Sequence, residues 1–326
     1  LKEDGSILTK TKIKGKNAGN IMVTADALTM RDLLASETEI GGDAGSITVN
    51  ANTVNLEKGG LIQAFTKGEG NAGSVTVQGR GGKGTAAKTL TIGGTEEVTG
   101  IETGASAFSS GDGGNIEIVA ETVTIEDGGF ISSETLSTGN AGSIMVVADT
   151  LTMRGKKTVE FDGEFIEFPS MIESSGKSPT GDAGQIKVTA NIVNIEDSGS
   201  LIAVSSGGKV GSIIVNADKM ITLIDAQLAV QILGGEKKQD PAEIRLTTPT
   251  LTISGGRITA LSLFPTNAGN INLNVGSLVT SMGAKRATID SLSNGDGDAG
   301  QVRIQGVDST AVAPTPVPGI VMLSDT

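Results

Sequence analysis

The chain has 326 residues without His, Cys, Trp or Tyr, and its 37 acidic and 25 basic residues give a net charge of −12. The absence of His and Cys excludes Ser-His-Asp and Cys-His catalysis, disulfides, and the ordinary zinc, haem and iron–sulfur ligand sets. An acidic chain with 2% aromatic residues lacks the basic stripe and stacking rings of a nucleic-acid interface, and no apolar run is long enough for a membrane helix.

The chain opens partway through a repeated pattern. Residues 3–9, Glu-Asp-Gly-Ser-Ile-Leu-Thr, align with residues 57–63, Glu-Lys-Gly-Gly-Leu-Ile-Gln, which form the third apolar segment of a later repeat. An uncapped first repeat would expose core side chains and strand edges. We therefore expect that the sequence is a fragment or a processed product, or that another molecule covers this end.

A tetrapeptide recurs ten times between residues 17 and 301. It consists of a turn residue, a small residue, usually Gly, and then Ser, Asn or Gln, with a base spacing of about 27 residues between copies. Asn, Asp and Gly at a corner suit a left-handed backbone conformation, and stacked copies are expected to form hydrogen-bonded ladders. The residues that we predict to form this structural corner ladder are Asn17, Gly19, Asp43, Gly45, Asn71, Gly73, Asn140, Gly142, Asp182, Gly184, Asn267, Gly269, Asp298 and Gly300.

Three short apolar segments follow each tetrapeptide. The first is an alternating pair present in all ten copies, as in Ile47 and Val49. A second pair follows about five residues later, as in Val54 and Leu56, and a third run follows Gly or Ser, as at Ile62. Period-two alternation with β-branched residues predicts strands. Each repeat is therefore expected to contain three short strands separated by turns.

One such repeat buries its apolar face only by stacking on its neighbours. The sequence therefore predicts an all-β fold over residues 1–305, a right-handed parallel β-helix of about 10 to 11 rungs with roughly 27 residues per rung. Inward Ile, Val, Leu and Ala would fill its narrow bore, where large aromatic rings would not fit. At ~4.8 Å per rung, the rod would be about 50 Å long.

Two repeats carry insertions. The first, near residues 79–88, is rich in Gly and Lys and is expected to be a surface loop. The second, residues 155–168, contains Phe161, Phe165 and Phe168 among four acidic residues. Either the insertion forms a hairpin whose rings pack on the outer face of the rod, or the rings form a patch for a ligand or partner. We treat the three phenylalanines as a candidate partner patch.

The repeat pattern ends after Ile304. Residues 306–326 instead contain a proline-rich linker and a short apolar strand, which we treat as a candidate assembly strand. It could belong to a disordered tail or a link to a further domain, add to the open end of a neighbouring molecule, or cap its own rod. The candidate assembly residues are Ile320, Val321, Met322 and Leu323.

Neither acidic corners nor outward threonines predict a specific site. Glu57, Glu126-Asp127 and Glu196-Asp197 recur at one corner and could bind calcium if stacked, but the Gly-Gly-x-Gly-x-Asp calcium repeat is absent. Thr-x-Thr pairs such as Thr150 and Thr152 could form an ice-binding rank, but their register is interrupted and β-propensity accounts for them. We predict no catalytic residue, no cofactor and no metal.

The repeat unit carries a family resemblance. Asn-Ala-Gly-Ser-Ile-x-Val-x-Ala-x-x-Leu-Thr-Met, followed by Gly-x-Ile-x-Ser, resembles repeats of filamentous-haemagglutinin-like exoproteins of cyanobacterial and environmental bacterial type. Residues 43–62 and 140–153 carry it best, and it covers about residues 5–305, without the family's secretion domain and its Asn-Pro-Asn-type motifs. The resemblance implies a right-handed β-helix, two-partner secretion through an outer-membrane transporter, an extracellular or cell-surface location, and adhesion or fibre roles.

These observations favour a non-enzymatic extracellular rod, a subunit or segment of a surface fibre that assembles head to tail. The alternative is a carbohydrate-binding or polysaccharide-degrading β-helix, which a groove lined by three or more acids with Arg or Lys would favour. A surface-layer or ice-binding rod is a third interpretation. The expected partners are further copies of the chain, the transporter, and a glycan or other cell-surface ligand, with no nucleic acid and no membrane span.

Overall fold

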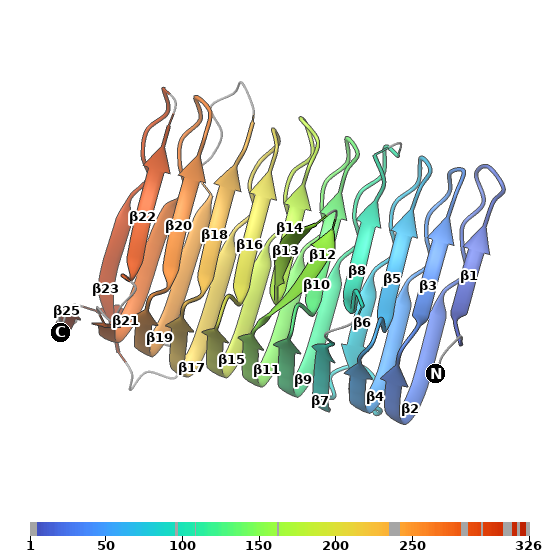
Figure 1. Ribbon diagram of the computed structural model, residues 1–326, viewed down its shortest axis with the longest axis horizontal. Coiled ribbons are helices and arrows are strands. Elements are labelled where there is room, and N and C mark those ends of the chain that lie inside the picture. The colour runs from blue at the N-terminus through green and yellow to red at the C-terminus, as the bar shows by residue number, and fades with distance from the viewer. Residues whose placement is uncertain are drawn as a thin grey trace.

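The protein is a parallel β-solenoid in which successive coils stack along one axis, with the first and last coils at opposite ends (Figure 1). It has about ten turns of roughly 29 residues, so the predicted parallel β-helix is confirmed. The inserted segments make the average turn longer than the base spacing of the repeat. The computed structural model describes residues 5–94, 97–107, 109–161, 163–234, 242–281, 286–294, 296–308, 315–317 and 320–323.

One side of the coil is a sheet of ten short parallel strands, called sheet A. Equivalent residues pair from coil to coil, so that Ile101 lies between Ile62 and Ile131. Its strands are β1 (Ile7–Thr11), β3 (Leu33–Thr38), β5 (Leu61–Thr66), β8 (Gly100–Ala105), β10 (Phe130–Thr135), β14 (Met171–Gly176), β16 (Ser200–Ser205), β18 (Gln227–Ile232), β20 (Arg257–Ser262) and β22 (Thr288–Ser293).

The rest of the coil forms a second sheet, called sheet B, most of whose strands are 10 to 12 residues long. Except where β24 pairs antiparallel with β23, its neighbouring strands are parallel. Its strands are β2 (Ile21–Met30), β4 (Ile47–Leu56), β6 (Val75–Gln78), β7 (Ala87–Gly93), β9 (Ile116–Glu126), β11 (Ile144–Arg154), β15 (Ile186–Glu196), β17 (Ile213–Ile224), β19 (Glu243–Ser254), β21 (Asn270–Ser281), β23 (Val302–Asp308), β24 (Thr315–Val317) and β25 (Ile320–Leu323).

The expectation of three separate strands per repeat is wrong for most coils, because the first two apolar pairs lie in one bent strand. In β11 and β15 the pairing passes from Ala148 to Thr150 and leaves Asp149 outside the ladder. Only one residue drops out at the bend, so the hydrogen-bonded sheet continues around it. The two halves become separate strands, β6 and β7, where the loop at residues 79–86 interrupts them.

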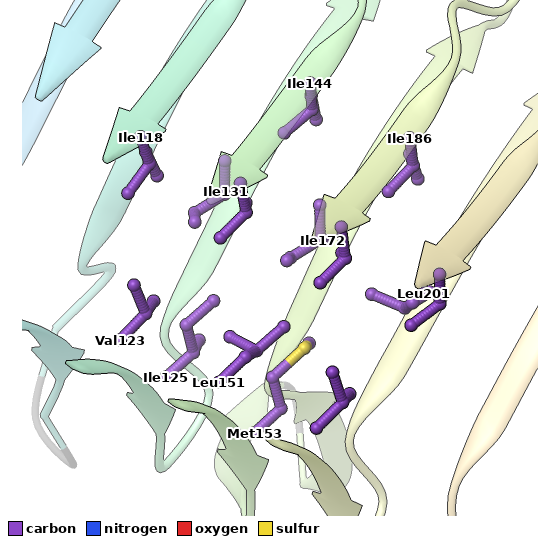
Figure 2. Packing of buried hydrophobic residues seen from close by; sticks show 14 of the residues in the cluster. Ile118, Val123, Ile125, Ile131, Ile144, Leu151, Met153, Ile172, Ile186 and Leu201 are labelled. Atoms are coloured by element: carbon purple, nitrogen blue, oxygen red, sulfur yellow. The ribbon is translucent and has the colours of Figure 1, made fainter. Parts of the chain in front are cut away.

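The core is a continuous column of aliphatic side chains between the two sheets. Figure 2 shows Ile131 and Ile172 of sheet A and Leu151 and Met153 of sheet B entering the same space. Each of these four side chains is fully buried. Inward positions alternate with outward ones, as the period-two pattern predicts. Stacking therefore buries an apolar face that a single coil would leave exposed.

Two phenylalanines of sheet A lie on its outer face and cover glycines of a neighbouring strand. A Cβ added to Gly100 would lie 2.6 Å from the ring of Phe130, and one added to Gly104 would lie 2.9 Å from the ring of Phe65. The rings therefore rest on bare backbone outside the bore. Their outward position agrees with the expectation that large rings do not fit within the narrow aliphatic interior.

The tetrapeptide glycines are required by coil stacking, so their predicted left-handed conformation is wrong. Gly45 and Gly142 do not have positive φ, but a Cβ on either would overlap the carbonyl oxygen of the equivalent glycine in the preceding coil. Left-handed residues occur instead at another corner, where Asp127 and Gly128 have φ of 52° and 80°. There Gly129 N–H donates to the Glu126 carbonyl at 2.9 Å and closes the turn.

The 155–168 insertion forms an antiparallel hairpin of β12 (Lys156–Phe161) and β13 (Glu164–Pro169) across the outer face of sheet A, near β10 and β14 (Figure 1). At the other end of the chain, β25 pairs in parallel with residues 277–280 of β21. It thereby occupies the place of the missing second half-strand in the last coil. The candidate assembly strand thus lies on its own rod, the third of the interpretations above, and its pairing with a neighbour stays a prediction.

Candidate functional site

The predicted corner ladder is made of side-chain-to-backbone hydrogen bonds. The Oδ1 atom of the first tetrapeptide residue accepts a hydrogen bond from the backbone N–H of the equivalent residue one coil later. Asn and Asp both supply this oxygen, which accounts for their exchange. The donor–acceptor pairs are Asp43–Asn17 (2.9 Å), Asn71–Asp43 (2.9 Å), Asp112–Asn71 (2.9 Å), Asn140–Asp112 (2.7 Å), Asp182–Asn140 (3.0 Å), Lys209–Asp182 (2.6 Å) and Asp298–Asn267 (3.0 Å).

A rank of buried serines on sheet A completes this corner. Ser133 Oγ accepts a hydrogen bond from Gly142 N–H at 2.8 Å and donates to the Gly114 carbonyl of the preceding coil at 2.9 Å. We did not predict these serines from the sequence. The signal is an inward Ser nine or ten residues before the tetrapeptide glycine. The other members are Ser36, Ser174 and Ser291.

Two of the corner glutamates pair with arginine side chains of a neighbouring coil. Arg31 Nε donates to Glu57 Oε1 at 2.6 Å, and Arg154 Nη2 donates to Glu126 Oε2 at 2.8 Å. The hydrogen bond from Arg31 lowers the pKa of Glu57. Within the described part of the chain, no group of three or more acidic side chains is placed to hold a metal ion. Glu57 and Glu126 therefore each form an ion pair with a neighbouring coil.

The three phenylalanines of the predicted partner patch do not lie together. Directly opposed residues of an antiparallel pair share a face of the hairpin. Phe168 therefore lies on the same face as Lys157, whereas Phe165 lies on the opposite face with Glu160. Phe168 lines a cleft between the hairpin and sheet A, whereas Phe165 is 71% exposed. The side chain of Phe161 lies outside the described residues.

The cleft under the hairpin has a volume of about 280 Å³ and combines acidic, basic and apolar side chains, so we call it the hairpin cleft. Glu102 of β8, Ser132 of β10 and Glu173 of β14 occupy one outward rank, because Ser132 pairs with both glutamates. Glu134 lies two residues after Ser132, and Lys177 Nζ contacts its Oε2 atom at 2.8 Å. The other residues that line the cleft are Val98, Gly128, Phe130, Lys157, Val159, Phe168, Pro169 and Met171.

Burial shapes the protonation of this cleft. Burial raises the pKa of Glu102, although a hydrogen bond from Gln63 Nε2 at 3.2 Å opposes the shift. Burial also raises the pKa of Glu173, with the charge of Lys177 opposing it. For Lys177 burial acts to lower the pKa, but the hydrogen bond to Glu134 and the nearby carboxylates raise it overall.

Lys157 differs from the other charged residues of the cleft. Its side chain comes from the hairpin, and the residue as a whole is only 9% exposed. The side chain makes no hydrogen bond or ion pair with any described residue. The aliphatic stem of a lysine can be buried while its ammonium group stays in contact with solvent, and Lys157 Nζ is not among the buried unpartnered atoms of the described residues. The same cleft is therefore lined by an unpaired lysine and by two carboxyl groups whose pKa is raised.

A second, more open hollow lies on the other side of the hairpin and has a volume of about 410 Å³. Its charged side chains are largely paired. Lys156 contacts Glu167 at 2.7 Å, and Arg257 donates to Thr259 at 2.7 Å and to Asp290 at 3.3 Å. The hairpin cleft, with its unpaired lysine, is therefore the stronger candidate for a ligand site.

Comparison with protein-family models, with curated proteins and with solved structures finds no match for this chain. The resemblance to filamentous-haemagglutinin-like exoproteins rests on the repeat residues, and what it implies stays a prediction. The part of the chain that the structure describes contains no helix that could serve as a membrane span.

Proposed function

We propose that this protein is a non-enzymatic, extracellular β-solenoid rod, a subunit or segment of a bacterial adhesin or surface fibre. The observation that carries the proposal is the hydrogen bonding from coil to coil on every side of the rod. Sheets A and B connect the coils along their strands, and the corner ladder and buried serines connect them at the turn. A molecule of this kind suits a mechanical role.

The core supports the same role. Nearly all of the apolar side chains that fill the coil are aliphatic, and they stack in continuous ranks from one coil to the next. Bending the rod would separate these ranks and open several hydrogen bonds at once, so the structure resists bending. A stiff rod can hold a binding surface away from a cell or transmit tension along a fibre. The resemblance of the repeats adds secretion through an outer-membrane transporter to the proposal.

Assembly end to end belongs to the same proposal. Parallel strands at the end of a solenoid offer backbone hydrogen-bonding groups that another coil can continue, and a contact between unlike ends propagates as a filament. β25 is connected by a linker that contains Pro316, and it joins β21 through backbone pairing. The same pairing made with another copy would join two rods.

Electron microscopy of the purified protein tests this proposal. We expect unbranched rods with a coil repeat of ~4.8 Å along their axis, joined into longer fibres as the concentration rises. Light scattering across the same concentrations measures the assembly independently. Separate rods at every concentration, together with NMR evidence that residues 320–323 move freely, would contradict assembly. Fibres without adhesion to any bacterial or host cell would leave only the structural half of the proposal.

The carbohydrate-binding alternative gains one specific observation. The hairpin cleft brings together Glu102, Glu134 and Glu173 with two lysines, which is the combination that we set as favouring this alternative. The cleft is small, and one of its acids is already paired with Lys177. These features favour binding of a small group over cleavage of a polymer.

A further inference from the structure

We propose that the hairpin cleft binds a single hydroxylated sugar ring, either neutral or carrying one carboxylate, between Lys157, Glu102 and Glu173. This inference goes beyond the rod function and does not depend on fibre assembly. It assigns a ligand site to the outer face of sheet A at the place where the hairpin crosses it. The hairpin then has a role in addition to covering the rod.

Lys157 provides the first argument. Its side chain is largely buried along the hairpin, and its ammonium group reaches the cleft without gaining a partner among the described residues. A ligand oxygen in the cleft would supply the missing acceptor. A hydroxyl, a ring oxygen or a carboxylate could each do so, and the carboxylate would add charge pairing.

Glu102 and Glu173 provide the second argument. They lie on either side of Ser132 in the same outward rank of sheet A, and burial raises the pKa of both carboxyl groups. Glu102 accepts one hydrogen bond, from Gln63, and retains further acceptor positions. Hydroxyl donors from a ligand would satisfy these positions without bringing a second charge into the cleft.

The charges of the cleft exclude the simpler ligand classes. Lys157 and Lys177 disfavour a metal cation or an organic dication, and three glutamates disfavour phosphate or sulfate. A purely apolar ligand would offer no acceptor to Lys157 and no donor to the remaining acceptor positions of Glu102. A sugar ring has several hydroxyl groups, each of which can donate and accept, so it satisfies both kinds of group at once.

The shape of the cleft matches a ring-sized ligand. Its volume of about 280 Å³ lies just below the ~300–1,000 Å³ of pockets that hold drug-sized molecules. Phe130, whose ring lies against Gly100, and Phe168 of the hairpin both line the cleft. An aromatic face can pack against the C–H face of a pyranose while the hydroxyl groups reach the polar side chains.

The hairpin is anchored at its base, so the cleft has a defined wall. Ser170 Oγ donates to the Arg154 carbonyl at 2.7 Å and accepts from Gly128 N–H at 3.1 Å. Ser170 N–H also donates to the Gly155 carbonyl at 3.0 Å, directly across the base of the hairpin. Lys157 is two residues from this base, which keeps its backbone close to sheet A.

Saturation-transfer NMR with the purified chain tests the assignment. The probes are the methyl glycosides of glucose, galactose and N-acetylglucosamine and the methyl glycoside of glucuronate, with leucine as a zwitterion of similar size. We expect transfer to at least one glycoside and none to leucine. A stronger signal from the glucuronide that is lost in Lys157→Met shows that Lys157 pairs with the ligand carboxylate, and equal signals show that the cleft takes a neutral ring.

Matched variants locate the binding. Lys157→Met removes the ammonium but keeps the length of the side chain, and we expect it to weaken binding about tenfold or more. Glu173→Gln retains the shape of the carboxyl group and should also weaken binding. Lys187→Met, at an exposed position of β15, should bind like the unchanged protein. Thermal unfolding of each variant verifies that it is folded.

Three results would overturn the proposal. The first is the absence of transfer to every glycoside, the second is leucine binding in place of sugars, and the third is unchanged affinity in both Lys157→Met and Glu173→Gln. None of these measurements depends on fibre formation, so failure of the sugar site leaves the electron-microscopy test of the rod unaffected. Conversely, a protein that binds a glycoside but forms no fibres would contradict only the assembly proposal.

Discussion

The backbone N–H of Asp43 donates a hydrogen bond to the side-chain Oδ1 of Asn17, 26 residues earlier, at 2.9 Å. The side chain of Asp43 then accepts the N–H of Asn71 at the same distance. Each such residue is thus a donor toward one neighbouring coil and an acceptor toward the other. This side-chain oxygen explains why Asn and Asp recur at the first position of most copies of the tetrapeptide.

We predict that Asn71→Ala destabilises the rod by about 1 kcal/mol, because the N–H of Asp112 loses its acceptor. Asn71→Asp should change the stability little, since Asp43 performs the same role with a carboxylate oxygen. Urea denaturation followed by circular dichroism measures both variants. Equal stability of the Ala and Asp variants would show that the corner bond contributes nothing.

Gly142→Ala is expected to destabilise the protein by about 1–3 kcal/mol or more, since its Cβ would overlap the Gly114 carbonyl and force two coils apart. The matched control is Gly19→Ala, the same tetrapeptide position in the first coil. There the nearest atom would be Thr9 Cγ2 at 3.5 Å, an ordinary contact. Thermal unfolding should separate the two variants clearly, and a similar loss in both would contradict the stacking explanation.

The buried serine rank can be tested with Ser133→Ala. This change leaves the Gly142 N–H and the Gly114 carbonyl without their partner inside the corner, at a cost of about 1–3 kcal/mol. Ser132→Ala, one residue away on the outer face of sheet A and without a hydrogen bond to the corner, is the control and should cost clearly less than Ser133→Ala. Hydrogen exchange at Gly142 should accelerate in the first variant alone.

The raised pKa values of Glu102 and Glu173 predict a pH-dependent penalty. Because the folded pKa exceeds the unfolded one, ionisation of these groups disfavours folding, and the cost appears as the pH rises through the folded pKa. The double variant Glu102→Gln, Glu173→Gln should therefore unfold at a higher temperature than the unchanged protein at pH 8. The difference should shrink on acidification toward pH ~4.3, the unperturbed Glu pKa. A difference that grows on acidification would contradict this sign.

Much of the architecture follows from local pattern. The alternation at Ile144, Val146, Leu151 and Met153 identifies which residues face the core, because side chains of a strand point to opposite sides in turn. The tetrapeptide spacing identifies where one coil ends and the next begins. The same pattern misplaced the left-handed corner, since Gly serves close stacking at Gly142 and positive φ at Gly128, and composition does not distinguish the two uses.

Alignment of the third apolar runs would have placed Glu102, Ser132 and Glu173 in one row, because Ile101, Ile131 and Ile172 are equivalent. It would not have identified a cleft. The cleft exists only because the hairpin of residues 156–169 folds across this row and not away from it. The three phenylalanines of the insertion suggested a single patch, but strand pairing places Phe165 and Phe168 on opposite faces.

The sequence by itself determined the repeat, the aliphatic core and the parallel stacking, because alternation and turn residues act within one coil and every coil repeats them. Only the tertiary structure decided where β25 pairs, which corners take left-handed residues, and that Lys157 lines the same cleft as Glu102 and Glu173. These outcomes depend on contacts between segments that share no local pattern. Such contacts form only once the coils have stacked and given the hairpin a surface to cover.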